Sequence, residues 1–297
     1  MLSLFSSFNA VTNRCKCSNY SWISYLCNVK KSGLQILISN DDGYRSKGLR
    51  VVTDFMRAYG DVTVVAPATP QSGKSAALGL FQDLYLEQLA DEPHYRLFSF
   101  SGTPVDCVKM GMRILEEDGI VPDLVISGIN HGSNATAAAA YSGTIGAAIE
   151  AAYYRVPAIA LSLDSHDEDA DFSPVTDYLG TILDHYFETG LSEGILLNIN
   201  FPAIPSDQIK GIRIAHQGQA SWRREFDLAT DAEGRSCFRI SGTLLDFEKN
   251  YESGGYLQAD HLLVKDGYIS IVPHRIDTTD YDEAERLAKA WKCDTIS

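Results

Sequence analysis

Two adjacent carboxylates, Asp41 and Asp42, come directly after Asn40, at the end of the mostly apolar segment 34–39. If both are buried at the end of a strand, they repel each other and the pKa of one of them rises. A divalent cation removes that cost, and carboxylate, hydroxyl and amide oxygens suit Mg²⁺, Mn²⁺ or Ca²⁺ better than zinc. A plain Asp-Asp-Gly turn has the same composition, but a position between an apolar strand and a helix favours a functional site.

Two neutral oxygen side chains, Ser72 and Asn130, could complete such a cation site. Taken singly, Ser72 is typical of a loop and Asn130 of a turn at a strand end. Only their convergence with Asp41 and Asp42 would make them ligands.

A second chemical feature is the start of a predicted helix at Tyr141-Ser142-Gly143-Thr144. Backbone N–H groups at a helix start, with two hydroxyls beside them, form a phosphate site. Ser142 is also a favoured N-cap residue, and both roles can hold at once. Ser-Gly-Thr recurs from Ser101 and from Ser241, so the tripeptide alone has little specificity.

Residues 68–75 fit a relaxed Walker A pattern, which makes a P-loop NTPase a minor alternative. Pro70 in the middle of the pattern removes an N–H group that a phosphate cradle needs. The residues after Ser75 also show little helical periodicity, whereas a P-loop leads into a helix.

Short apolar runs alternate with amphipathic stretches through the first two thirds of the chain. Strands are predicted at 34–39, 62–66, 97–100, 123–127, 158–163 and 195–199, and helices at 46–59, 105–115, 142–153 and 175–187. This alternation indicates an α/β fold with a parallel sheet covered on both faces. Ligands bind beyond the carboxyl ends of such strands, where Asp41, Asp42, Ser72 and Asn130 are expected to lie.

The pattern changes beyond Pro202. Strands are predicted at 212–215 and 238–240, with a hairpin of 262–264 and 268–272 across 265–267 and a last helix at 280–292. Residues 206–255 are rich in polar side chains, which favours an extended arm or loop region over a second core.

Composition limits the class of protein. The chain has 297 residues, 45% hydrophobic and 22% charged, with a formal charge of −14. These values are typical of a globular domain, and the sequence contains no apolar run long enough to cross a bilayer. The acidity argues against long nucleic acid and anionic membranes as partners.

The residues before Asp41 differ from the rest, because they include four basic residues and no acidic one. With those four set aside, the remainder carries −18. Residues 1–33 are interpreted as a disordered extension or a misassigned upstream start, with a targeting peptide as the alternative. Three of the six cysteines lie in this leader and the other three are scattered, which fits a reducing cytoplasm better than a disulfide scaffold.

Several ordered segments resemble the SurE survival-protein family of nucleotidases. The matching segments are Ile36–Gly43, Ala66-Pro67 with Ser72-Gly73, Ser101–Cys107, Ser127–Asn130 with Gly132 and Asn134, Tyr141–Thr144, Asn198–Pro202 and Gly267–Pro273. The resemblance implies a Rossmann-like, mostly parallel sheet flanked by helices, with a C-terminal β-rich oligomerisation arm at about 205–275 within a domain of 34–297. It also implies a homodimer or homotetramer.

The resemblance further implies a 5′-nucleotidase that needs one divalent cation per subunit, Mg²⁺ or Mn²⁺. Carried over by position, the metal ligands are Asp41, Asp42, Ser72 and Asn130. The residues that hold phosphate or substrate are Gly73, Asn134, Ser142, Gly143 and Thr144. The expected reaction is attack on a nucleoside monophosphate by a metal-activated water oriented by Asp41 or Asp42, with an aspartyl-phosphate as the alternative intermediate.

One segment departs from the family pattern. Between Asn134 and Tyr141 the family often has a Gly and an Asp, whereas this chain has Ala135-Thr136-Ala137-Ala138-Ala139-Ala140. No implied metal ligand is lost, but the loop's contacts with substrate change. A non-catalytic nucleotide- or metal-binding protein on the same scaffold is therefore the rival hypothesis.

Overall fold

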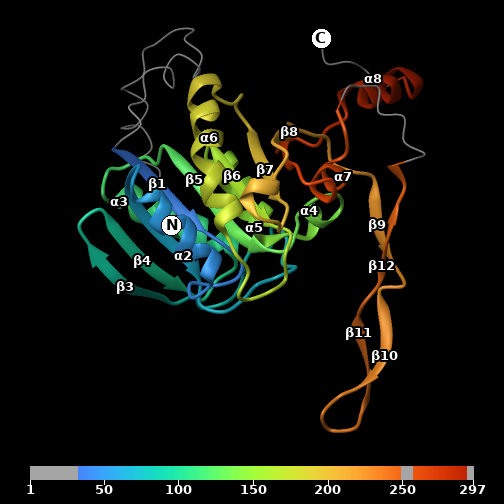
Figure 1. Cartoon of the computed structure of the whole chain (residues 1–297), viewed down its shortest axis with the longest axis horizontal. Coiled ribbons are helices and arrows are strands. Elements are labelled where there is room, and N and C mark those ends of the chain that lie inside the picture. The colour runs from blue at the N-terminus through green and yellow to red at the C-terminus, as the bar shows by residue number, and fades with distance from the viewer. Residues whose placement is uncertain (1–32, 249–256, 293–297) are drawn as a thin grey trace.

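The computed structural model describes residues 33–248 and 257–292, and its centre is a nine-stranded sheet (Figure 1). The strand order is β3-β4-β2-β1-β5-β6-β7-β13-β8. The strands of this sheet are β1 (Leu34–Ser39), β2 (Gly60–Pro67), β3 (Leu86–Glu92), β4 (Tyr95–Phe100), β5 (Leu124–His131), β6 (Ala158–Leu163), β7 (Ile195–Phe201), β8 (Ile212–Ile214) and β13 (Ile269–Arg275).

The six strands from β4 to β7 in this order are mutually parallel, which confirms the predicted α/β fold class. In the centre, Ile36 of β1 lies between Val62 of β2 and Leu124 of β5. Only β3 and β13 run antiparallel to a neighbour, β4 and β7 respectively.

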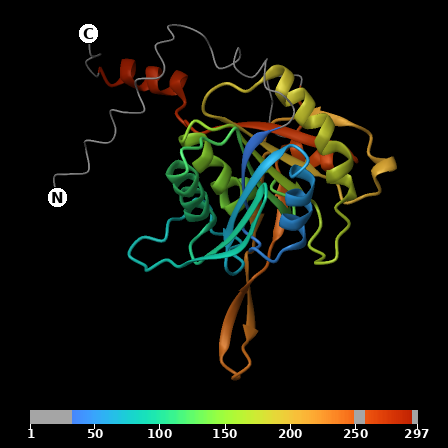
Figure 2. The same cartoon turned by 90° about the vertical axis from the view of Figure 1, so that its left-hand side faces the viewer.

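Helices cover both faces of the sheet (Figure 2). One hydrophobic cluster joins the sheet to α2 (Lys47–Met56) and α6 (Ser173–Thr189), and a second joins it to α3 (Pro104–Glu117) and α5 (Gly143–Tyr153). Local signals begin these helices, because Ser46 caps α2 and Thr103 forms a capping box with Asp106 in α3. The remaining helical segments are α4 (Ala138–Tyr141), the 3₁₀ turn η2 (Ser206–Gln208), α7 (Asp260–Lys265) and α8 (Tyr281–Ala290).

The predicted hairpin of 262–264 and 268–272 is wrong in its first half. Residues 262–264 belong to helix α7, and the second half continues as β13, which pairs with β7. Leu263 packs in a small cluster with Ala215 and Val272. A run of only three apolar residues does not distinguish a helical turn from a strand by periodicity, and the tertiary contacts decide the outcome.

The predicted arm is a long two-stranded ribbon that projects from the body (Figures 1 and 2). Strand β9 (Ala220–Arg223) pairs with β12 (Thr243–Asp246), and β10 (Phe226–Thr230) pairs with β11 (Ser236–Ile240), both antiparallel. The described residues of β10, β11 and β12 are mostly exposed, which fits the polar composition of this segment.

Two sequence predictions concern membranes and the leader. Within the described ranges, no helix is long and apolar enough to cross a bilayer. The prediction for residues 1–33 falls almost entirely outside the described part of the chain, which starts at Gly33.

Candidate active site

Asp41 lies directly beyond β1 and is almost fully enclosed, with 3% of its surface exposed. Its Oδ1 accepts a hydrogen bond from the hydroxyl of Thr144 in α5. A Cβ atom on Gly143 would lie only 2.8 Å from the Cβ of Asp41, so the start of α5 rests against this carboxylate. Burial, opposed by the Thr144 hydrogen bond and assisted by the charge of Asp42, raises the pKa of Asp41 from 3.8 to about 6.

Asp42 is half-buried beside the end of β5. Its Oδ2 accepts the backbone N–H of His131 at 3.2 Å, and the Nδ1 atom of the same histidine lies 3.3 Å away. The His131 ring in turn packs edge-on against Phe172, with 5.1 Å between ring centres. These contacts fix the second carboxylate relative to the ends of β1 and β5.

The loop with Ser72 and Gly73 lies between the Asp41 turn and the start of α5. Gln71 donates its N–H to the carbonyl of Asp41 at 2.7 Å, and Ser75 donates its N–H to the carbonyl of Tyr141 at 2.9 Å. Ser72 and Gly73 themselves are exposed. Residues 76–85, all of them described, form no helix, so this segment lacks the architecture of a P-loop.

Asn130 is the seventh residue of β5 and stands next to His131. Its Nδ2 donates to the carbonyl of Gly132 at 2.7 Å, which fixes the side-chain amide at the end of the strand. The fold therefore brings the turn after β1, the loop after β2 and the end of β5 to one edge of the sheet, as predicted for Asp41, Asp42, Ser72 and Asn130.

Asn134 is buried and tied to the scaffold. Its Nδ2 donates to Ser162 Oγ at 2.8 Å, its N–H to Asn200 Oδ1 at 2.8 Å, and its carbonyl accepts from Asn198 Nδ2 at 2.9 Å. Sequence reasoning assigned no role to Asn198 or Asn200. Two amides that alternate along a buried strand are a usable signal, because buried amides need hydrogen-bond partners.

The start of α5 has the geometry expected of a helix N-terminus. Ser142 Oγ accepts the N–H of Ile145 at 3.2 Å, which confirms Ser142 as the N-cap. Thr144 is fully buried, and its hydroxyl is directed to Asp41. The two features of chemical interest in the sequence, the paired carboxylates and the helix start, therefore lie in direct contact.

The donor set fits a hard cation. Within residues 33–248 and 257–292, no Lys or Arg forms an ion pair with Asp41 or Asp42, and no three His, Cys, Asp or Glu side chains gather as metal ligands. A cation here would therefore take two carboxylates and neutral oxygens, the set that Mg²⁺ and Mn²⁺ accept. Burial, with a smaller contribution from the charge of Asp42, raises the pKa of Asp41, so the enclosed carboxylate disfavours its charged form.

Together, the fold and this edge define a doubly wound α/β protein with an oxygen-donor site beyond the carboxyl ends of its parallel strands. Residues 36–224 match the family described as "Survival protein SurE", and the chain belongs to this family.

The chain aligns with similar proteins over nearly their whole length. It is 38% identical over 259 residues to 5′-nucleotidase SurE of Christiangramia forsetii, covering 86% of this chain and 96% of the relative. The protein of the same name from Cytophaga hutchinsonii is 40% identical over 257 residues, with the same coverage. The crystal structure of the SurE protein from Aquifex aeolicus superposes with a TM-score of 0.71 at 30% identity, covering 86% of this chain and 99% of that one.

Proposed function

We propose that this protein is a metal-dependent 5′-nucleotidase that hydrolyses nucleoside 5′-monophosphates to nucleoside and phosphate. The observation that carries the proposal is the contact between the buried Asp41 carboxylate and the N-terminus of α5. This contact supports the proposal, because it brings the proposed cation ligand Asp41 against a helix start of the kind that binds phosphate. The names of the relatives support a nucleoside 5′-monophosphate as the substrate.

The proposed cofactor is one Mg²⁺ or Mn²⁺ per subunit, held by Asp41, Asp42, Ser72 and Asn130. When bound, such a cation neutralises phosphate charge and lowers the pKa of a water molecule bound to it. The same cation offsets the repulsion between the two carboxylates, to which the described part of the chain brings no Lys or Arg and only the His131 ring beside Asp42.

The chain's own groups hold and orient the reactants. The backbone N–H groups at the start of α5, with Ser142 and Thr144 beside them, favour a bound phosphate. Gly73 and Asn134 belong to the loops that flank this position. Asp42 is less buried than Asp41, so it is the carboxylate assigned to orient the attacking water. Water then forms a new bond to phosphorus as the bond to the nucleoside oxygen breaks, and the leaving oxygen receives the proton that the water loses.

The rival function, non-catalytic binding of nucleotide or metal, is motivated by the alanine-rich segment at 135–140. Release of inorganic phosphate from nucleoside 5′-monophosphates distinguishes the two. An enzyme releases phosphate with Mg²⁺ or Mn²⁺, whereas a binding protein releases none with any metal while it remains folded.

The proposed assembly is a homodimer or homotetramer formed through the arm. Four exposed apolar side chains lie on one face of the β10–β11 ribbon, since Phe226 pairs with Ile240 and Leu228 with Phe238. Their exposed fractions are between 65% and 83%. A projecting apolar face of this kind is typical of an interface with another copy of the chain.

Leu228→Asp is expected to shift the protein to a smaller oligomer, because it places a charge in the centre of that face. Ala229→Asp is the matched control, because the next residue of the strand points to the opposite face of the ribbon. Light scattering coupled to size exclusion measures the masses. An unchanged mass for Leu228→Asp would contradict the role of this face in assembly.

The proposed location is the cytoplasm. Cys107 and Cys237 are free thiols, and Cys107 is buried. Free cysteines in a chain of this size are common where the compartment is reducing.

A further inference from the structure

Thr136 has an unusual backbone conformation in the loop between β5 and α5. Its φ is +58, and it is buried with 3% exposed. A β-branched residue rarely adopts this left-handed conformation. Such a conformation persists where the surrounding structure holds it in place.

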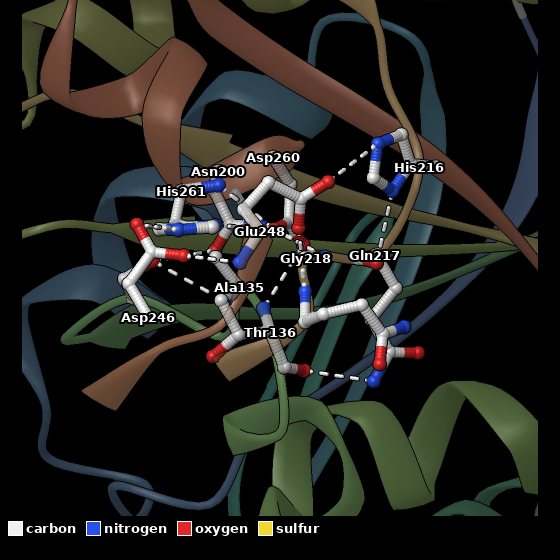
Figure 3. Close-up of polar contacts among 12 residues, drawn as sticks. Ala135, Thr136, Asn200, His216, Gln217, Gly218, Asp246, Glu248, Asp260 and His261 are labelled. Carbon is white, nitrogen blue, oxygen red and sulfur yellow. Dashed lines mark hydrogen bonds and ion pairs between the residues drawn. The ribbon is translucent and has the colours of Figure 1, made fainter. Parts of the chain in front are cut away.

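Two side chains hold the Thr136 backbone from both sides (Figure 3). Asp260 Oδ2 accepts the N–H of Thr136 at 3.0 Å, and Gln217 Nε2 donates to the carbonyl of Thr136 at 2.9 Å. Gln217 lies three residues before β9, and Asp260 is the first residue of α7. Both partners therefore belong to the root of the arm, about 80 residues or more further along the chain.

The Asp260 carboxylate is fully buried, and backbone groups occupy both of its oxygens. Its Oδ1 accepts the N–H groups of Gly218 at 3.0 Å and His261 at 2.7 Å. A carboxylate with three N–H donors in fixed positions is a rigid acceptor, and charge strengthens each of these hydrogen bonds. Asp260 thus locks Thr136 to the segment that leads into β9.

The returning strand of the arm joins the same cluster. His261 Nε2 lies 3.4 Å from Asp246 at the end of β12, and His216 Nε2 lies 3.2 Å from Glu248. Both strands at the base of the ribbon are therefore connected to the residues around Asp260 (Figure 3). The arm root is one polar unit, and Thr136 is attached to it.

We infer that Gln217 and Asp260 are positioning residues that clamp residues 133–141, the substrate loop, in the conformation that binds phosphate. The inference rests on the proposed function, because the proposed phosphate-binding groups lie at the two ends of this loop: Asn134 near its beginning and the start of α5 directly after it. From Thr136, the chain reaches Asn134 in two residues and Ser142 after the single turn of α4. Release of Thr136 frees the chain between Asn134, which β6 and β7 still hold, and Ser142 at the start of α5, so the arm root affects phosphate affinity.

Gln217→Glu tests the clamp with little change in shape, since it removes the N–H donor to the Thr136 carbonyl. Gln88→Glu is the matched control: it makes the same change at an exposed position of edge strand β3, outside the arm root and the substrate loop. We expect KM for adenosine 5′-monophosphate to rise about 5-fold in Gln217→Glu, the usual effect of one lost hydrogen bond. The kcat should change less than about 2-fold, since the loss is in binding, and the control should match wild type.

Asp260→Asn is the second variant, expected to raise KM about 10-fold or more because one oxygen becomes an N–H donor facing other donors. Hydrogen–deuterium exchange of residues 133–141 gives a readout that needs no turnover. Uptake should increase in Gln217→Glu and Asp260→Asn, provided each variant melts cooperatively, and should be unchanged in Gln88→Glu. Wild-type uptake in Gln217→Glu, or faster uptake with an unchanged KM, would overturn the inference.

Inactivity of the wild-type protein would refute the proposed nucleotidase but leave the clamp testable. Binding of inorganic phosphate in the presence of Mn²⁺, measured by calorimetry, then replaces KM. A Kd raised in Gln217→Glu and not in Gln88→Glu supports the clamp. Equal Kd values, or no phosphate binding by the wild type, refute it.

Discussion

Asp41→Asn is expected to lower kcat/KM for a nucleoside 5′-monophosphate by about 1,000-fold or more, because it removes a charge from the proposed cation site. Asp41 is the more buried of the two carboxylates and the one in contact with α5. Its loss therefore affects both metal affinity and the alignment of the helix start with phosphate. Steady-state assays over a range of Mg²⁺ and Mn²⁺ concentrations measure the effect.

The same substitution should leave the protein folded and raise the melting temperature of the metal-free form at pH 8. The folded-state pKa of Asp41 is raised from 3.8 to about 6, so its ionisation costs stability as the pH rises through that range. Above about pH 6, the ionised carboxylate lowers the free energy of unfolding by about 3 kcal/mol at most. A neutral amide at this position avoids that loss. Wild-type turnover in Asp41→Asn, or a melting temperature well below wild type, would contradict this account of the site.

Gly143→Ala is expected to reduce kcat/KM by about 100-fold, since a displacement of about 1 Å at a reacting centre has an effect of that size. A Cβ at this position would lie 2.8 Å from Asp41 Cβ and 3.0 Å from Pro104 Cγ. Neighbours on two sides leave the new methyl no free space, so either Asp41 or the start of α5 must move. Kinetic assays and the melting temperature measure activity and stability separately.

Gly180→Ala provides the matched control for this prediction. Gly180 lies inside α6, and the atom nearest to a Cβ there is Tyr59 Oη at 3.5 Å, which is ordinary contact. Alanine in a helix interior should add about 0.5–1 kcal/mol of stability without a change in activity. If Gly143→Ala were as active as Gly180→Ala, close contact between α5 and Asp41 would not be needed for catalysis.

The α/β core could be predicted because each element has a strong local signal. Leu34–Ser39 and Ala158–Leu163 are mostly apolar segments, and the structure ends these strands where the sequence prediction does. Strand β3 gives no such signal, because it is an edge strand with almost all of its residues exposed. Helix α7 was missed because its apolar residues are too few to show a period.

The paired carboxylates and the helix start could be located from sequence because both lie at the ends of predictable elements. The groups that hold the loop between them could not. Asn200 contacts Asn134, and Asp260 contacts Thr136 across 124 residues of sequence. Such contacts depend on which strands pair and how the arm root packs against the body, and a single sequence carries no periodic signal for that pairing.

The most direct test of the proposed 5′-nucleotidase activity is release of inorganic phosphate from a panel of nucleoside 5′-monophosphates, with Mg²⁺, Mn²⁺ or chelator and with 3′-monophosphates for comparison. We expect release that requires the divalent cation, is abolished by chelator and is strongly reduced in Asp41→Asn. No release from the folded wild-type protein with either metal would contradict the nucleotidase and favour a binding protein on the same scaffold.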